Sequence, residues 1–345
     1  MGSDDGPVIG TSPRSHGDPR RSPTASPGAH TSQYGDRPAT AAWTDRAILA
    51  GSAYRDGQAL SARQALYRWL NPQRDPAGIV AARAAAHLMQ EPHGRTWPRR
   101  SPAPAPLADP GATGPGGASG PAAGHEPRPC VLDVGAGNGL YTRRLHADHP
   151  ELQVAALDIS ARILRDVPRP VLVADAAHLP VADGSVSVVL AMHMLYHLAD
   201  PDAGIGELAR VLAPGGLVAV STNHSRDKHE LDELWQAAAR DVLGTTQVPA
   251  RVSLSSRFPL EAAADRLREH FTDLELIDLG GVIEIPEPRP VVAHLASYRA
   301  WADQMGVPFA AVIDQAARRL AEHLDRYGTF TITSRVGMVM GKRPR

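Results

Sequence analysis

The chain of 345 residues is poor in cysteine, in aromatic side chains and in net charge. Its single cysteine, Cys130, cannot form a disulfide within the chain, which fits a reducing compartment. The formal net charge is −1, so the composition offers no excess of positive charge for binding nucleic acid or an anionic membrane. No apolar run approaches the roughly 18 residues of a transmembrane helix, and the N-terminus lacks the apolar core of a signal peptide. We therefore predict a cytoplasmic protein without a membrane partner.

Two stretches have few large apolar side chains. Residues 1–40 contain 22 Gly, Pro, Ser or Thr, and residues 91–129 contain 17 Pro or Gly. Such segments cannot bury enough apolar surface to offset the entropy lost on ordering. We predict a disordered tail over 1–42 and a Pro/Gly-rich linker over 91–129.

Residues 43–90, between these stretches, carry helical patterns. Apolar side chains recur on one face of a helix over 57–70, and this helix is expected to end before Pro72. Asp75 is placed to cap a second helix over 76–90, which has proline at its first position. We predict an N-terminal helical segment.

A strand, a glycine-rich turn and a helix follow one another after the linker. The apolar run 131–134 precedes Gly135, Gly137 and Gly139, and a helical stretch begins at Leu140. Glycine lets a backbone pass close to a ligand, and the free N–H groups of a helix start can face polar ligand atoms. The spacing G-x-G-x-G differs from the dinucleotide pattern G-x-G-x-x-G, because Leu140 stands where the last glycine would be. This difference disfavours a NAD-dependent oxidoreductase.

Acidic residues follow further predicted strands. Asp158 ends the second apolar run, 19 residues after the last glycine, close to where nucleotide-binding sheets place a carboxylate for ribose hydroxyls. Asp175 follows a third apolar run. A fourth strand is expected over 185–193 and a fifth over 217–222, with helical patterns between them. This alternation predicts a parallel sheet with right-handed crossovers.

Residues 223–329 are predicted to form a mostly helical insertion before a final strand over 330–340. Helices are expected over 227–243, 259–271, 290–303 and 308–327, and a sixth strand over 272–279. Helices over the carboxyl ends of the strands are where a pocket for a second ligand would be built.

With this ordered set of motifs, the sequence resembles the class I S-adenosylmethionine-dependent methyltransferases, in particular the broad methyltransferase type 11 group that includes the ubiquinone- and menaquinone-type enzymes. The matching stretches are VLDVGAGNG, ALDIS, ADAAHLP, HMLYHLADP and ELARVLAPGGLVAVST. The strong part of the resemblance covers about residues 130–223.

The resemblance implies an α/β fold with a Rossmann-like, doubly wound, seven-stranded sheet. The last strand would be antiparallel, with N-terminal helices before the sheet and a helical insertion late in it. The methyltransferase domain would span 130–345, with the cofactor half at 130–222. The segment 43–90 would then lie against the mouth of the cofactor site as a lid, or, alternatively, only cover the edge of the sheet.

The cofactor implied by the resemblance is S-adenosyl-L-methionine. The loop residues Gly135, Ala136, Gly137 and Gly139 would hold its methionyl part through backbone groups. Asp133 would meet the ammonium group, directly or through water.

The adenosine part would be held by residues after the next two strands. Asp158 would accept hydrogen bonds from both ribose hydroxyls, a bidentate role that needs a carboxylate. Ile159 would pack on the adenine, Asp175 would accept from its exocyclic amine, and the Ala176 N–H would face a ring nitrogen. Each acid alone could be a helix cap or a solvated turn, but three in series at strand ends favour the cofactor site.

Histidines cluster after the fourth strand. Methyl transfer needs a base only when the acceptor must lose a proton. His197 and His193 are the candidate bases, with Tyr196 beside them, and His193 is also counted among the cofactor-site residues. Each histidine could instead bond a backbone carbonyl. His224 and His229 could join the pocket, but the four histidines match no familiar metal-ligand spacing, so no metal is predicted.

The predicted function is S-adenosylmethionine-dependent methyl transfer to O, N or C of a small-molecule acceptor, with secondary metabolism as one context. An RNA base methyltransferase is an alternative that the near-neutral charge disfavours. A non-catalytic cofactor-binding scaffold is another, and the glycines and acids argue against it. No pattern specifies an oligomeric state.

Overall fold

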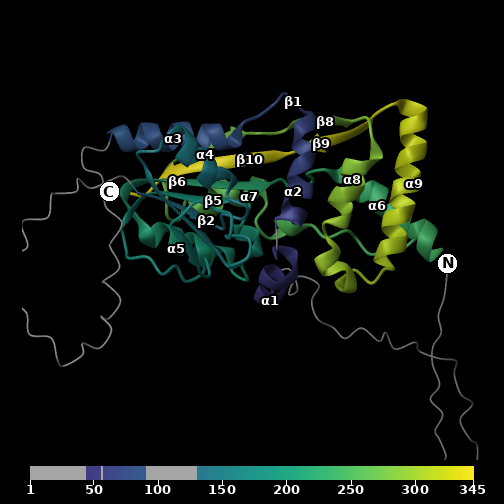
Figure 1. The fold of residues 1–345 in the computed structure, drawn as a ribbon, viewed down its shortest axis with the longest axis horizontal. Coiled ribbons are helices and arrows are strands. Elements are labelled where there is room, and N and C mark those ends of the chain that lie inside the picture. Colours follow the sequence, from purple (N-terminus) through teal and green to yellow (C-terminus); the bar gives the residue numbers. More distant parts are fainter. Residues whose placement is uncertain (1–43, 56, 91–129) are drawn as a thin grey trace, which may run out of the picture. The chain divides into compact units, whose positions relative to one another are not determined.

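The computed structural model describes residues 44–55, 57–90 and 130–345, and these form the ribbon of Figure 1. The predicted disordered tail over 1–42 and the predicted linker over 91–129 lie outside the described residues. Within the described ranges, no helix has both the length and the apolar content needed to cross a membrane.

A seven-stranded sheet with the order β4-β3-β2-β5-β6-β10-β7 organises the chain after residue 130. Its strands are β2 (Cys130–Val134), β3 (Gln153–Asp158), β4 (Val171–Val173), β5 (Val186–Met192), β6 (Leu212–Asn223), β7 (Thr272–Asp278) and β10 (Val336–Lys342). β2 pairs in parallel with both β3 and β5, whereas β10 runs antiparallel to both of its neighbours. The predicted Rossmann-like fold with an antiparallel last strand is confirmed. Because the chain crosses from one side of β2 to the other, the carboxyl ends of β2 and β5 flank the crevice where such sheets bind ligands.

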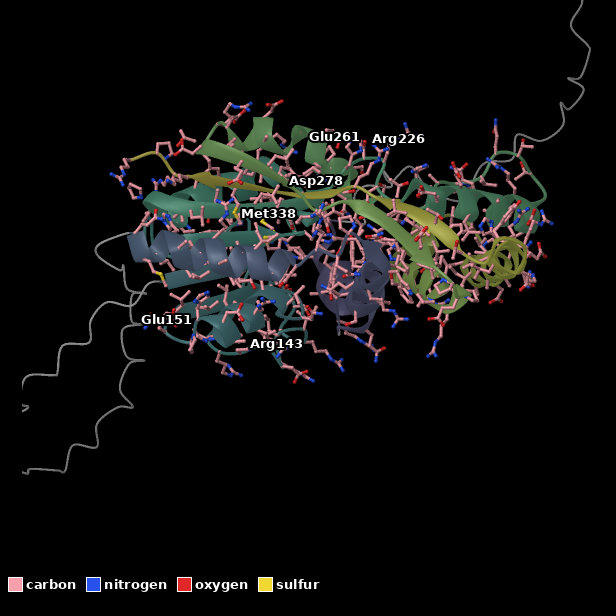
Figure 2. The ribbon with its side chains drawn as sticks, turned by 90° about the horizontal axis from the view of Figure 1, so that it is seen from above. Arg143, Glu151, Arg226, Glu261, Asp278 and Met338 are labelled. Atoms are coloured by element: carbon pink, nitrogen blue, oxygen red, sulfur yellow. The ribbon has the colours of Figure 1, made fainter. Side chains whose placement is uncertain are left out.

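Helices cover both faces of this sheet (Figure 1). All seven residues of β5 are buried, as expected for a strand covered on both faces. One face packs against α3 (Pro76–Gln90) and α4 (Leu140–Asp148), and the other packs against α5 (Pro201–Val211) and α7 (Leu260–Leu267). Met338 of β10 belongs to the core cluster shared with α3 and is labelled in Figure 2.

The helix α3 begins as predicted. The Asp75 carboxylate accepts a hydrogen bond from the Gly78 N–H at 2.9 Å, which caps the helix next to Pro76. Its alanine-rich face is buried: Ala81 and Ala84 are 0% exposed. Small side chains on this face let the helix backbone lie close to the sheet.

The N-terminal segment departs from the prediction before α3. The helix expected over 57–70 is shorter: α2 (Gln58–Gln64) passes into a 3-10 turn (Ala65–Trp69) and then into a short strand, β1 (Leu70–Asn71). The apolar face predicted from the periodicity is present, because Leu66 and Leu70 are buried. Periodicity alone does not distinguish an α-helix from a helix that tightens into a 3-10 turn.

The prediction of one final strand over 330–340 was wrong. The chain divides at Arg335 into β9 (Phe330–Ser334) and β10, which belong to different sheets. Arg335 N donates to the Asp227 carboxylate at 2.7 Å, and Arg335 O accepts from His224 N at 2.8 Å, so its backbone groups are satisfied outside the ladder. A continuous apolar run cannot show that its two halves have different partners.

A three-stranded antiparallel sheet, with the order β1-β8-β9, was not predicted. Its middle strand is β8 (Gly281–Ile285), so the insertion over 223–329 is not only helices and β7. This sheet shares a hydrophobic cluster with α6 (His229–Leu243), α8 (Pro288–Ala296) and α9 (Phe309–Tyr327). The helix expected over 290–303 is α8 followed by a 3-10 segment (Arg299–Gln304).

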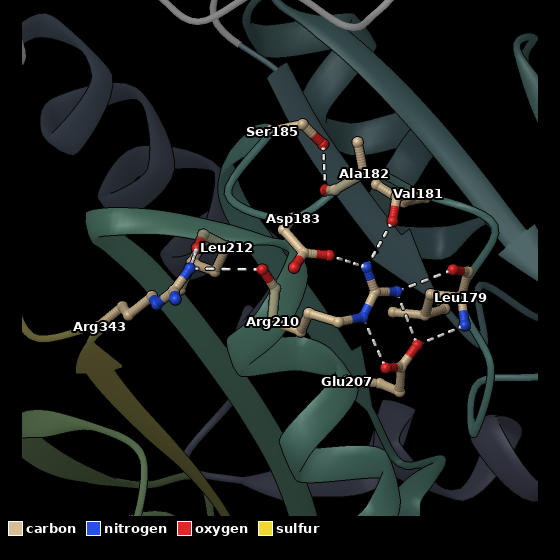
Figure 3. A network of polar contacts seen from close by, with 9 residues as sticks. All are labelled: Leu179, Val181, Ala182, Asp183, Ser185, Glu207, Arg210, Leu212 and Arg343. Carbon is tan, nitrogen blue, oxygen red and sulfur yellow. Dashed lines mark hydrogen bonds and ion pairs between the residues drawn. The ribbon is translucent and has the colours of Figure 1, made fainter.

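An arginine-centred network fixes the connection from β4 to β5 (Figure 3). Arg210, near the end of α5, donates to both carboxylate oxygens of Glu207 at 2.7 and 2.8 Å and to Asp183 at 2.5 Å. It also donates to the carbonyl oxygens of Leu179 and Val181. The network lies where β5 begins, at the edge opposite the carboxyl ends of the parallel strands, so its role is structural.

Candidate active site

Three parts of the chain line a cavity of about 710 Å³ at the carboxyl ends of the parallel strands. The first part is the glycine loop with the ends of β3, β4 and β5, the second is the N-terminal segment up to Ala77, and the third is the insertion after β6. A volume of this size lies within the range of pockets for small molecules and cofactors.

The glycine loop needs its glycines. Gly135 has φ +69°, and a Cβ added there would lie 2.6 Å from the Met194 Cβ. Gly139 has φ +76° and begins α4, and a Cβ there would meet Val167 at 2.9 Å. Side chains are disfavoured at both positions by conformation and by space. Gly135, Ala136 and Gly137 line the cavity as predicted, whereas Gly139 lies behind them and shapes the turn.

Asp158, at the end of β3, is tied to the glycine loop. Its two carboxylate oxygens accept hydrogen bonds from Gly137 N and Ser160 N, both at 2.9 Å. Burial raises the pKa of Asp158, and these backbone N–H groups oppose the shift. Asp158 and Ile159, both predicted to contact the cofactor, line the cavity.

Asp175 and Ala176 line the same cavity, one strand further along the sheet. Asp175 accepts from Ala177 N at 3.0 Å and forms an ion pair with Arg46 of α1 (Arg46–Ile48). Arg46 is 64% exposed. An exposed arginine of the N-terminal segment is thus paired with the acid that was predicted to accept a hydrogen bond from the adenine amine.

Asp133 lies in β2 and is 1% exposed, but it is not part of the cavity wall. Thr142 Oγ1 donates to its Oδ2 at 2.6 Å, while its Oδ1 has no hydrogen-bond partner. Burial raises the pKa of Asp133 to about 6, since the charged form is poorly solvated there. The predicted contact with a ligand ammonium group therefore needs a bridging water or a small movement of the loop.

The structure brings His193 and His197 to the cavity, on either side of Tyr196. His193 has φ +55°, and burial and Lys228 lower its pKa to about 4. His193 is therefore neutral at pH 7 and a weak base. His197 Nε2 lies 2.6 Å from the Tyr54 hydroxyl, so the predicted base is hydrogen-bonded to a residue of the N-terminal segment.

Part of the chain is similar in sequence to known proteins. Residues 132–220 match the protein family described as "Methyltransferase domain". This part of the chain is a methyltransferase domain. Malonyl-[acyl-carrier protein] O-methyltransferase of Hahella chejuensis is 35% identical over 112 residues, which are 30% of this chain and 40% of the relative. Demethylmenaquinone methyltransferase of Corynebacterium urealyticum is 41% identical over 96 residues, which are 26% and 40%.

Both matches span two fifths of the relatives' own length, so the similarity concerns the domain and not the whole proteins. Among solved structures, phosphoethanolamine N-methyltransferase 2 of Haemonchus contortus aligns with a TM-score of 0.36 and 16% identity, over 63% of this chain and 49% of that chain.

Several cavity residues lie outside the matched residues 132–220 and were not predicted. They are Tyr54, Arg63, Tyr67, Lys228, Arg251, His294 and Tyr298. They come from the N-terminal segment and from the insertion, which the domain family does not cover. Five of them are polar or aromatic residues within predicted helices, whereas Tyr54 and Arg251 lie outside every predicted helix, so no sequence pattern indicated those two.

The structure does not bring all four histidines together. His224 and His229 are absent from the cavity wall and lie beside Glu261 and Glu230, at 3.7 and 3.5 Å. Across the described ranges, no group of three or more His, Cys, Asp or Glu is arranged to hold a metal ion.

Replacing Asp133 by asparagine is expected to raise the melting temperature of the ligand-free protein at pH 7.5. A carboxyl group whose pKa is raised on folding binds more protons folded than unfolded, so stability falls as pH rises from about 4 to about 6 and stays lower above it. The raised pKa of Asp133 corresponds to a loss of about 3 kcal/mol in the free energy of unfolding above pH 6. Asparagine keeps an acceptor for Thr142 without the charge.

Thermal unfolding from pH 4 to pH 8 tests this, with Asp166→Asn on the exposed surface as the control. Identical melting temperatures for wild type and Asp133→Asn over the whole range would contradict the assignment.

Proposed function

We propose that the protein transfers the methyl group of S-adenosyl-L-methionine to O, N or C of a small-molecule acceptor. One observation carries this proposal: a single cavity is lined both by the glycine loop with Asp158 and Asp175 and by a group of tyrosines and histidines. A cofactor and an acceptor bound in one cavity can meet without crossing solvent.

The described residues fit the cofactor. Gly135, Ala136 and Gly137 expose their backbone to the cavity, and Asp133 has a buried oxygen atom without a partner among the described residues. The Asp158 carboxylate accepts hydrogen bonds from the backbone of Gly137, Ser160 and Ile159, and a carboxylate has about four acceptor positions, so one remains for a ribose hydroxyl and sharing admits the second. When bound, the cofactor would supply a methyl group activated by a positively charged sulfur, and the protein would mainly orient the reactants.

In this proposal the N-terminal segment 43–90 acts as the lid of the site. Leu49, Tyr54 and Leu60 line the cavity opposite the sheet. Ser160 Oγ donates to the Tyr54 carbonyl at 3.0 Å, which joins the segment to the loop after Asp158. A closed lid would exclude water and hold the acceptor in place.

Tyr54 and His197 would act as a pair toward an acceptor that loses a proton. Their 2.6 Å hydrogen bond lets one partner pass or hold a proton while the other faces the cavity. Burial raises the pKa of Tyr54, so its hydroxyl stays protonated at pH 7 unless the acceptor or His197 takes the proton. His193 is the weaker candidate because its pKa is about 4.

Isothermal titration calorimetry tests the cofactor assignment. We expect S-adenosylmethionine and S-adenosylhomocysteine to bind in a buffer with EDTA and NAD not to bind. Binding of NAD in place of both would overturn the proposal. Incubation with labelled S-adenosylmethionine and a host metabolite extract, followed by identification of the labelled product, then tests the transfer itself.

A further inference from the structure

One arginine of the cavity wall has no acidic partner among the residues that the structure describes. Arg63, in α2, lines the cavity. Its guanidinium lies 4.9 Å from the centre of the Tyr54 ring and 5.5 Å from that of Tyr298. Both terminal nitrogens, Nη1 and Nη2, are buried without a hydrogen-bond partner. The Tyr54 side chain forms a hydrogen bond with the guanidinium, but no described residue accepts from Nη1 or Nη2. A buried cation whose terminal nitrogens lack acceptors is costly.

Two further cations of the cavity wall that are not exposed, Lys228 and Arg251, are paired. Lys228 Nζ lies 2.5 Å from the Asp227 carboxylate and donates to the Tyr67 hydroxyl at 2.9 Å. Arg251 Nε donates to Asp232 at 2.8 Å. In the part of the chain that the structure describes, Arg63 forms no ion pair with a carboxylate. The described acids thus pair with Lys228 and Arg251, whereas the positive charge of Arg63 is left without an acidic partner among the described residues.

A buried histidine, His294, lies close to these same three cations. His294 lines the cavity, and its Nδ1 has no hydrogen-bond partner. Burial lowers its pKa far below the ordinary value, and Arg251, Lys228 and Arg63 lower it further. His294 therefore stays neutral and cannot add positive charge.

We propose that Arg63 binds an anionic oxygen group, a carboxylate or a phosphate, of the methyl acceptor. The planar guanidinium fork matches either group and can make two parallel hydrogen bonds. Tyr54 and Tyr298 hold the fork by ring contacts, and the tyrosines of the wall favour an acceptor with a flat apolar body beside its anionic group. This inference rests on the proposed function, because it describes the acceptor of the same site.

The test uses the full chain saturated with S-adenosylhomocysteine, after its binding has been measured for each variant. Benzoate, phenyl phosphate and neutral benzamide are the probes, and ligand-observed NMR detects weak binding. We expect at least one anion to bind the wild type about tenfold or more tightly than benzamide. Arg63→Met should abolish this preference and Arg63→Lys should reduce it. Arg68→Met, at an exposed arginine of the same segment that contacts Glu287, should retain it.

The melting temperature of each variant shows whether it is folded. Arg63→Met should melt at a higher temperature than the wild type without anion, because it removes a buried unpaired charge. Added benzoate or phenyl phosphate should raise the melting temperature of the wild type and of Arg68→Met, but not that of Arg63→Met. Intact S-adenosylhomocysteine binding without any anion preference, or the same preference in Arg63→Met, overturns this inference alone. If the wild type does not bind S-adenosylhomocysteine at all, the proposed function is overturned instead.

Discussion

Replacing Asp158 by alanine is expected to weaken binding of S-adenosylhomocysteine by about 1.5–3 kcal/mol, or roughly 10- to 150-fold. The substitution removes the acceptor proposed for two ribose hydroxyls, which would then be buried without partners. It also removes the acceptor for Gly137 N at 2.9 Å, so the glycine loop loses an anchor to the end of β3. Both effects act on the same ligand, which is why the loss should be large.

Calorimetry measures this loss, with Asp175→Ala as the matched comparison. Asp175 lies at an end strand of the sheet and is shared with the exposed Arg46, and an adenine amine that loses its partner there can still bond water. We expect the smaller loss in Asp175→Ala. Small and equal losses in the two variants would rule out the roles assigned to both acids.

Placing an acid on the buried face of α3 is expected to destabilise the protein by about 3–5 kcal/mol, because it leaves a buried charge without a partner. Ala81 is 0% exposed and packs in the cluster that contains Val131 and Leu145. Ala81→Asp therefore tests whether α3 is part of the fold or a loosely attached cover.

Ala82→Asp is the control, because the adjacent Ala82 is exposed on the same helix. Its effect should stay within about 0.5 kcal/mol. Urea denaturation gives both values from the midpoint and the slope. If Ala81→Asp were as stable as Ala82→Asp, α3 would not be packed on the sheet.

The sequence by itself determined the features whose causes are local. The glycines at 135, 137 and 139 predicted the loop, because positive φ and close packing exclude side chains there. Asp75 and Pro76 predicted the start of α3 for a similarly local reason. Asp158 and Asp175 could be placed in one site because parallel strands end at one edge of the sheet, which follows from the alternation of strands and helices.

The tertiary structure decided the features that depend on partners distant in sequence. The run 330–340 is apolar enough for one strand, and only the contacts of Arg335 with His224 and Asp227 divide it between two sheets. The hydrogen bond between Tyr54 and His197 joins residues 143 positions apart, and the lack of an acid beside Arg63 depends on every element that lines the cavity. Local patterns cannot encode such contacts, because each is set by packing between elements and not by the propensity of either one.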